Sequence, residues 1–161
     1  MKKYYKKLIK PEAKLCLVSS PGGHLSKLMS LKDWWGNYPH FFVTRNDDLT
    51  KNILQEEMVI EAFFPENRNM INLWKNLWLA IRVIRAEKPT HLFSLGAGVA
   101  IPFFVVGKLF GVKTIFMETF ITIPMQTMTG RVTYCLADYF VVQNKALLKD
   151  YKKAVYWGSL L

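Results

Sequence analysis

A short loop of serine, glycine and histidine is the first feature of the sequence that could carry chemistry. It runs from Ser19 to His24 (SSPGGH), between an apolar run and a helical stretch. Two glycines let a backbone approach a ligand closely, and a helix that begins there directs free N–H groups toward it. We expect Ser20, Gly22 and Gly23 to bind a phosphate or diphosphate; a plain tight turn is the alternative. The His24 imidazole could accept a proton from a hydroxyl, hydrogen-bond a phosphate, or simply cap the loop.

Two later loops also follow apolar runs and carry small or polar residues. The segment SLGAG at 94–98 repeats the glycine pattern, and we expect Gly96 and Gly98 to open the backbone at a helix start. Glu118 follows the run IFM and is expected to hold sugar hydroxyls or orient a reacting group, with a loop cap as the alternative. Side chains just beyond it could supply hydroxyl and phosphate contacts: Gln126, Thr127, Thr129 and Arg131.

Short apolar runs that alternate with helical stretches must position these loops. The runs predict strands at 14–19, 40–44, 58–63, 90–95, 113–117, 138–142 and 154–157. Helices are expected at 25–35, 48–57 (with Asp47 as its cap), 70–88, 99–110, 129–136 and 145–151. Regular alternation of this kind predicts an α/β fold: a Rossmann-like, doubly wound, mostly parallel sheet. Ligands bind such sheets at the carboxyl ends of the strands, where the three loops would meet.

The helix expected at 70–88 has apolar residues on both of its faces. On a helical wheel of about 100° per residue, one arc should pack on the sheet. That arc comprises Met70, Leu73, Leu77, Ala80, Ile81 and Ile84. The opposite arc mixes Leu79, Val83, Asn72 and Asn76 with the six residues that we predict to face a membrane: Ile71, Trp74, Lys75, Trp78, Arg82 and Arg85. Tryptophan beside lysine and arginine suits a lipid headgroup boundary. A protein interface and deeper burial of the helix are the alternatives.

Composition indicates one folded domain with an anionic partner. The 161 residues are 51% hydrophobic, which provides one core and excludes disorder for most of the chain. The net charge is +10, and the lysine-rich start suggests two regions, a basic segment at 1–13 and a Rossmann-like domain at 14–161. The basic segment could lie on an anionic membrane surface or be a solvated terminus. No usual nucleic-acid-binding module is present, so nucleic acid is not an expected partner.

The sequence predicts neither a transmembrane helix nor a bound metal or cofactor. No uncharged apolar run reaches about 18 residues, and no apolar signal core follows the basic start. Cys16 and Cys135 lack zinc-site spacing, and a buried thiol is expected at Cys16, in keeping with a reducing cytosol. The first glycine loop matches neither the dinucleotide-binding spacing nor a P-loop, which argues against NAD and ATP.

Five motifs occur in a fixed order and carry a family resemblance. They are Ser20–His24, Ser94–Gly98, Met117–Phe120, Thr127–Arg131 and Ala137–Gln143. The set, which covers about residues 14–158, resembles bacterial capsule and exopolysaccharide proteins of the PssD/CpsF type. These are similar to the membrane-anchor subunit of the eukaryotic dolichol-linked N-acetylglucosaminyltransferase. The chain also looks like the N-terminal half of the lipid II-forming enzyme of peptidoglycan synthesis.

The resemblance implies one half of a split GT-B glycosyltransferase. This chain would bind a polyprenyl-diphosphate-linked sugar acceptor at the cytoplasmic face of the plasma membrane, while a partner subunit binds the nucleotide sugar. The complex would transfer a hexosyl or N-acetylglucosaminyl group without a metal. By match of motif, Gly22, Gly23 and His24 would face the acceptor diphosphate, with His24 the first candidate for the catalytic base and Glu118 the second. A non-catalytic accessory anchor and a stand-alone soluble enzyme acting on a phosphorylated sugar are the rival interpretations.

Overall fold

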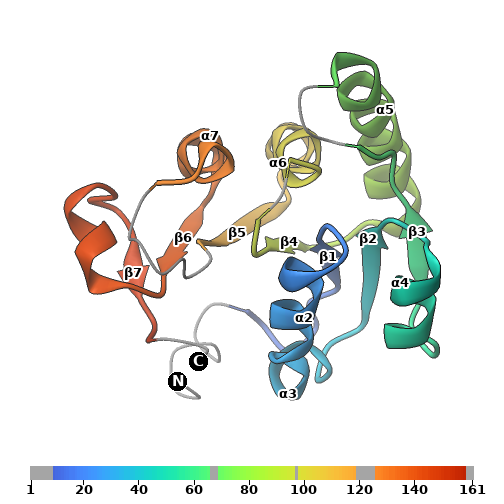
Figure 1. The fold of residues 1–161 in the computed structure, drawn as a ribbon, viewed down its shortest axis with the longest axis horizontal. Coiled ribbons are helices and arrows are strands. Elements are labelled where there is room, and N and C mark those ends of the chain that lie inside the picture. Colours follow the sequence, from blue (N-terminus) through green and yellow to red (C-terminus); the bar gives the residue numbers. More distant parts are fainter. Residues whose placement is uncertain (1–8, 66–68, 97, 119–125, 159–161) are drawn as a thin grey trace.

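A seven-stranded parallel sheet forms the centre of the computed structural model (Figure 1). The structure describes residues 9–65, 69–96, 98–118 and 126–158. The strands are β1 Leu15–Val18, β2 His40–Thr44, β3 Val59–Glu61, β4 His91–Ser94, β5 Lys113–Glu118, β6 Tyr139–Val142 and β7 Val155–Tyr156. Their spatial order is β3-β2-β1-β4-β5-β6-β7, and every adjacent pair is parallel. This order confirms the predicted Rossmann-like α/β domain.

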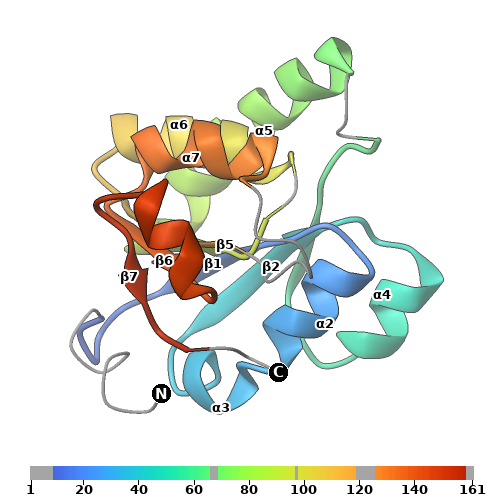
Figure 2. The same ribbon diagram turned by 60° about the vertical axis from the view of Figure 1, so that its left-hand side comes forward.

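Helices cover both faces of the sheet (Figures 1 and 2). One layer consists of α5 Met70–Glu87, α6 Ala100–Leu109 and α7 Met128–Leu136. The other consists of α2 Gly23–Met29, α3 Lys32–Trp35 and α4 Asp48–Ile53. A 3₁₀ helix, η1 Lys145–Lys149, links β6 to β7. Because both faces are covered, the central strands β1 and β4 are buried along their whole length, as is usual for parallel strands.

The core therefore has two halves, one on each side of the sheet. Alternate residues of β1 show the division: Cys16 and Val18 pack in the half beneath α5 and α6, whereas Leu15 and Leu17 pack in the half beneath α2 and α3. Cys16 is fully buried, as the sequence predicts, and burial raises the pKa of its thiol.

The helix predicted at 25–35 is wrong in one respect, because the structure divides it into α2 and α3. The indole N–H of Trp35 donates to the carbonyl oxygen of Leu28 at 2.8 Å, an acceptor that a continuous helix would pair with the Lys32 amide. The break places both Trp34 and Trp35 in the core. Periodicity alone could not reveal this, since both halves of the segment are helical.

Two other predicted helix ends agree with the structure, whereas the helix predicted at 48–57 already ends at Ile53. The Asp47 side chain accepts a hydrogen bond from the Thr50 amide and caps α4, as predicted. The last residue before Pro89 is Lys88, in the left-handed conformation at φ 47°, so α5 ends where the proline requires it to.

The folded region begins before residue 14. Ile9 and Ala13 are buried in the core half beneath α2 and α3. Residues 1–8 of the predicted basic segment lie outside the described residues. Among the described helices, none has the length and apolar character needed to cross a bilayer.

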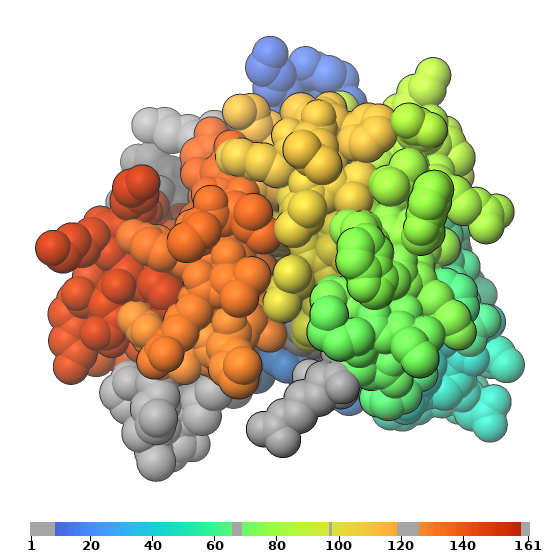
Figure 3. All heavy atoms as spheres, turned by 90° about the horizontal axis from the view of Figure 1, so that it is seen from above, coloured from blue at the N-terminus to red at the C-terminus, as the bar shows by residue number. Residues whose placement is uncertain are grey.

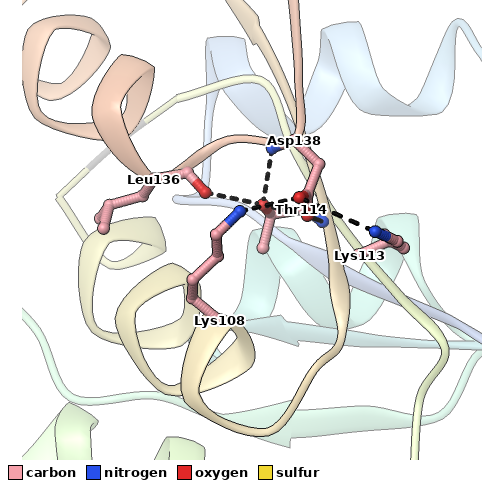
Figure 4. A network of polar contacts seen from close by, with 5 residues as sticks. All are labelled: Lys108, Lys113, Thr114, Leu136 and Asp138. Atoms are coloured by element: carbon pink, nitrogen blue, oxygen red, sulfur yellow. Dashed lines mark hydrogen bonds and ion pairs between the residues drawn. The ribbon is translucent and has the colours of Figure 1, made fainter.

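A polar cluster at the amino edge of the sheet joins β6 to β5 (Figure 4). The Asp138 carboxylate accepts hydrogen bonds from the Thr114 amide at 2.9 Å and from the Thr114 hydroxyl at 3.1 Å. Lys108 adds an ion pair at 2.7 Å. Burial alone would raise the pKa of Asp138, but these donors outweigh it and keep the pKa below its usual value. The cluster fixes the strands that lead to the opposite, carboxyl edge.

Candidate functional site

The two glycine loops lie side by side at the carboxyl edge of the sheet. β1 and β4 are neighbours in the sheet although β2 and β3 lie between them in the chain. The last residue of β1, Val18, pairs with the last residue of β4, Ser94. The chain passes from β1 to α2 on one face and from β4 to α6 on the other (Figure 1). This is the point at which the strand order reverses, where open α/β sheets bind their ligands.

His24 joins the two loops, because its ring lies against Gly96. A β-carbon at Gly96 would be 2.7 Å from Cε1 and 2.9 Å from Nδ1 of His24, so any side chain here would displace the His24 ring. Gly96 has φ +134°, which side chains also rarely adopt. The structure thus brings together three residues that the sequence singled out: His24, Gly96 and Gly22. Gly22 has φ +84° and immediately precedes the first turn of α2.

Serines shape the two loops, and two of them, Ser19 and Ser94, had no predicted role. The Ser94 hydroxyl donates to the Gly96 carbonyl at 3.0 Å and accepts from the Gly96 amide at 3.2 Å. In the first loop, the Ser19 hydroxyl donates to the carbonyl oxygen of Ser20, a residue that is 9% exposed. Gly98 accepts from the Ile101 amide at the start of α6, while Ala97 lies outside the described residues.

Glu118, at the end of β5, is buried with 1% of its surface exposed. The Thr127 hydroxyl donates to its Oε1 at 2.8 Å, and the Tyr151 hydroxyl donates to its Oε2 at 3.2 Å. A β-carbon on Gly130 would overlap Oε2, so this glycine makes room for the carboxylate. Burial raises the pKa of Glu118, and the two hydrogen bonds offset only part of that rise. The carboxylate is therefore hydrogen-bonded to other protein groups and does not lie on an open surface.

Two residues in this cluster had no predicted role. The Gln143 side chain donates to the backbone carbonyl of Glu118 at 3.4 Å. Tyr151 lies 33 residues beyond Glu118 in the chain and is 1% exposed. A tyrosine after a short helix resembles any core residue in a sequence, so only the fold reveals that its hydroxyl meets the carboxylate.

The start of α7 carries the remaining predicted ligand residues. Thr127 is its N-cap and accepts from the Gly130 amide at 2.8 Å, while also donating to Glu118. Arg131 is exposed one turn into the helix. Residues 119–125, which connect β5 to this helix, lie outside the described residues.

The outer face of α5 is exposed and apolar. Ile71, Trp74 and Trp78 are 70%, 60% and 67% exposed. The other predicted membrane-facing residues are exposed as well: Lys75, Arg82 and Arg85. A groove of about 520 Å³ runs along this face. It is lined by Phe63, Leu79 and all the predicted membrane-facing residues other than Arg85. The Lys75 ammonium lies 5.4 Å from the centre of the Phe63 ring.

The inward face of α5 differs from the predicted wheel. Asn72 and Asn76, expected on the outer arc, are buried, and so is Val83. Asn76 accepts from the Phe63 amide and donates to the Phe63 carbonyl, each at 2.9 Å. Met70, expected in the core, is 64% exposed. The wheel is wrong here because buried amide side chains pair with the backbone of the connection from β3, which hydrophobic periodicity does not detect.

The helices α5, α6 and α7 lie side by side in the layer seen from above in Figure 3, and their charged residues are mostly basic. α5 contributes Lys75, Arg82 and Arg85, α6 contributes Lys108 and α7 contributes Arg131. The three helices contain one acidic residue, Glu87, which is ion-paired with Lys14. Exposed apolar residues continue onto α7, where Met128 is 84% and Val132 45% exposed. The layer combines apolar surface with an excess of positive charge.

Comparison with known proteins gives one family. Residues 66–160 match the family described as "Oligosaccharide biosynthesis protein Alg14 like". The human protein "UDP-N-acetylglucosamine transferase subunit ALG14" is 23% identical over an alignment that covers 91% of this chain and 82% of that protein. The rat protein of the same name is 21% identical with the same coverage.

Solved structures share the fold at low identity. UDP-N-acetylglucosamine 2-epimerase from Rickettsia bellii superposes with a TM-score of 0.73 at 12% identity, over 92% of this chain and 45% of that chain. MurG from Acinetobacter baumannii gives 0.66 at 14% identity, over 82% and 41%. The chain thus spans less than half the length of these proteins, and the likeness confirms the GT-B type of Rossmann-like domain.

Proposed function

Since this chain belongs to the Alg14-like family of oligosaccharide biosynthesis proteins, we propose that it is the acceptor-binding, membrane-recruiting subunit of a two-component glycosyltransferase. The complex would transfer a sugar, N-acetylglucosamine by analogy with the named relatives, from a nucleotide sugar to a polyprenyl-diphosphate-linked saccharide. A capsule or exopolysaccharide pathway is the proposed setting. The observation that carries the proposal is the meeting of both glycine loops, through His24 and Gly96, at the strand reversal.

A separate donor-binding chain is part of this proposal. The chain spans less than half the length of each of the two solved proteins compared above, and we propose that a partner subunit supplies the donor-binding domain. The partner would lie across the carboxyl edge of this sheet and present the nucleotide sugar to the acceptor. Activity is then expected only from the complex.

The acceptor diphosphate would bind at the two glycine loops. Gly22, Gly23 and Gly98 would bring amides close to it, with Ser20 contributing a hydroxyl. Gly96, whose amide already donates to the Ser94 hydroxyl, would hold the second loop against His24. Thr127 and Arg131 at the start of α7 would complete the site, Arg131 as the cation that pairs with phosphate oxygens. No metal is invoked, because backbone dipoles and a guanidinium can stabilise the charge.

His24 is the proposed base that removes the proton from the acceptor hydroxyl. Glu118 was the second candidate, and its burial and two hydrogen bonds favour an indirect role instead. The experiment is transfer by purified chain and partner from UDP-N-acetylglucosamine to a polyprenyl-diphosphate sugar. We expect His24→Ala to lower kcat by about 100-fold or more, the usual contribution of a general base.

The control for His24→Ala is His91→Asn, which alters a histidine at the opposite end of β4 and should leave kcat near native. Full activity of His24→Ala would remove His24 from the proposed role.

The α5 face is proposed to rest on the cytoplasmic leaflet of the plasma membrane as a peripheral contact. Exposed Trp74 and Trp78 would enter the headgroup region, and Lys75, Arg82 and Arg85 would meet anionic lipids. We expect the double change Trp74→Ala and Trp78→Ala to weaken binding to phosphatidylglycerol vesicles by tenfold or more, since each indole buries roughly 150–250 Å².

The matched control is Leu49→Ala, on α4 in the other helical layer and 54% exposed. It should bind vesicles as the native chain does. Native-like vesicle binding by the double tryptophan variant would contradict this membrane contact.

The burial of Glu118 favours one alternative, a non-catalytic accessory subunit that anchors and activates its partner. In that case the His24→Ala complex would keep full activity, while the tryptophan variants would lose membrane recruitment. The two measurements together separate the alternatives.

A further inference from the structure

Tyr151 connects the last part of the described chain to the end of β5. Its ring packs between Phe140, 4.5 Å away, and Tyr134, 4.9 Å away, measured between ring centres. This packing aims its hydroxyl at Glu118 Oε2, 3.2 Å away. Burial, and then the adjacent carboxylate, raise the pKa of Tyr151, so the hydroxyl remains a hydrogen-bond donor at physiological pH.

The other oxygen of the same carboxylate holds the start of α7. Thr127 donates to Oε1 and, with the same hydroxyl oxygen, accepts from the Gly130 amide. The Arg131 amide donates to the Thr127 carbonyl at 3.0 Å. A displacement of Glu118 would therefore move Thr127, the first turn of α7 and the Arg131 side chain together. The absence of a β-carbon on Gly130 lets helix and carboxylate approach this closely.

We propose that Tyr151 is a positioning residue: by holding the Glu118 carboxylate, it fixes the first turn of α7, with Arg131, at the edge where the acceptor diphosphate binds. The identity of the ligand in this inference rests on the proposed function. The coupling between Tyr151 and α7 rests on the contacts alone. Tyr151 itself does not touch the substrate.

The kinetic test uses Tyr151→Phe, which keeps the packed ring and removes the hydroxyl. In the reconstituted complex we expect KM for the polyprenyl-diphosphate acceptor to rise about tenfold, less than the roughly 100-fold effect that a 1 Å misplacement can have. KM for the nucleotide sugar should stay within about twofold of native, because the partner binds the donor. A merely structural role would lower the amount of active complex without separating the two KM values.

Two matched variants sharpen the comparison. Tyr134→Phe removes a neighbouring hydroxyl that accepts from the Lys153 amide rather than contacting Glu118, and should leave acceptor KM native. Thr127→Val should raise acceptor KM as Tyr151→Phe does, whereas Thr127→Ser, which keeps the hydroxyl, should restore it. The double variant Tyr151→Phe with Thr127→Val should be less than additive, since both act through one carboxylate.

Hydrogen exchange tests the coupling without any activity. The Gly130 and Arg131 amides, which donate to Thr127, should exchange faster in Tyr151→Phe and at the native rate in Tyr134→Phe. A wild-type complex that transfers no sugar would refute the proposed function. Amide hydrogen exchange would still test the coupling between Tyr151 and α7. Unchanged exchange in Tyr151→Phe, or an unchanged acceptor KM in an active complex, would overturn the inference.

Discussion

Gly96 shows how a single residue can define the proposed acceptor site. Its left-handed backbone and the lack of a side chain let the His24 imidazole lie directly on the second loop. Two loops far apart in sequence thereby become one surface. The glycine is thus required by contact as well as by conformation, and these two requirements can be separated by experiment.

Gly96→Ala should lower the free energy of unfolding by about 1–3 kcal/mol, because strain in a rarely populated conformation adds to overlap with His24. Gly111→Ala is the control: it has φ +73° but open space around the position, so only the conformational penalty of about 1–2 kcal/mol applies. Urea denaturation measures both. Equal losses in the two variants would show that contact with His24 contributes nothing.

The Glu118 carboxyl makes stability depend on pH. Its pKa is raised by burial, so the native state binds this proton more tightly than the unfolded chain does. The resulting stability is complete below the unfolded pKa of about 4.3 and is lost as pH rises through the native pKa. Glu118→Gln stays uncharged and should show a flatter change in unfolding free energy between pH 5 and pH 8 than the native chain.

Denaturation at the two pH values provides the measurement for this prediction, with Glu56→Gln, at an exposed position, as the control. Identical pH profiles for Glu118→Gln and the native chain would contradict it. Greater stability at pH 8 together with weaker acceptor binding would indicate that the buried carboxylate is retained for function.

Among the elements, α5 shows how a helix can expose an apolar face and still be firmly attached. Buried Asn76 makes two hydrogen bonds to the backbone of Phe63, and Asn72 donates to the Pro65 carbonyl at 3.0 Å. These amides attach the N-terminal half of α5 to its connection from β3. The apolar side chains thereby remain available on the outer face.

Asn76→Ala should lower the free energy of unfolding by about 2 kcal/mol, because it leaves a backbone donor and acceptor unpaired in a partly buried place. It should also weaken vesicle binding, since the groove wall formed by Phe63 moves. Asn52→Ala, at an exposed position on α4, is the control. Native stability of Asn76→Ala would show that the connection does not depend on this side chain.

The sequence predicted the elements better than the contacts between them. Continuous apolar runs identified the strands because both faces of a parallel sheet are buried, and local signals such as Asp47 and Pro89 marked helix ends. The inward turn of Asn72 and Asn76 and the break after Met29 depend on partners elsewhere in the chain, which periodicity does not encode. The glycine loops and His24 form local motifs that the sequence displays. The contact of Tyr151 with Glu118 joins residues far apart in the chain, so the sequence did not reveal it.

For the whole molecule, the arrangement of layers relates the proposed site to the proposed membrane contact. The helices α5, α6 and α7 all begin at the carboxyl edge, where the glycine loops lie, and form one layer (Figures 1 and 3). This layer carries the excess of basic residues and the exposed apolar residues described above. A bilayer resting on this layer would place diphosphate headgroups near the strand ends. The opposite layer, with α2, α3 and α4, would face away from the lipid.

The most direct measurement is sugar transfer by the chain and its donor-binding partner, each alone and together, from UDP-N-acetylglucosamine to a polyprenyl-diphosphate-linked saccharide in phosphatidylglycerol vesicles. We expect transfer only when both chains and the lipid-linked acceptor are present, and we expect its loss when His24 or the exposed tryptophans of α5 are replaced. Transfer by the partner alone at the full rate, or equal transfer to an acceptor without its lipid, would contradict it.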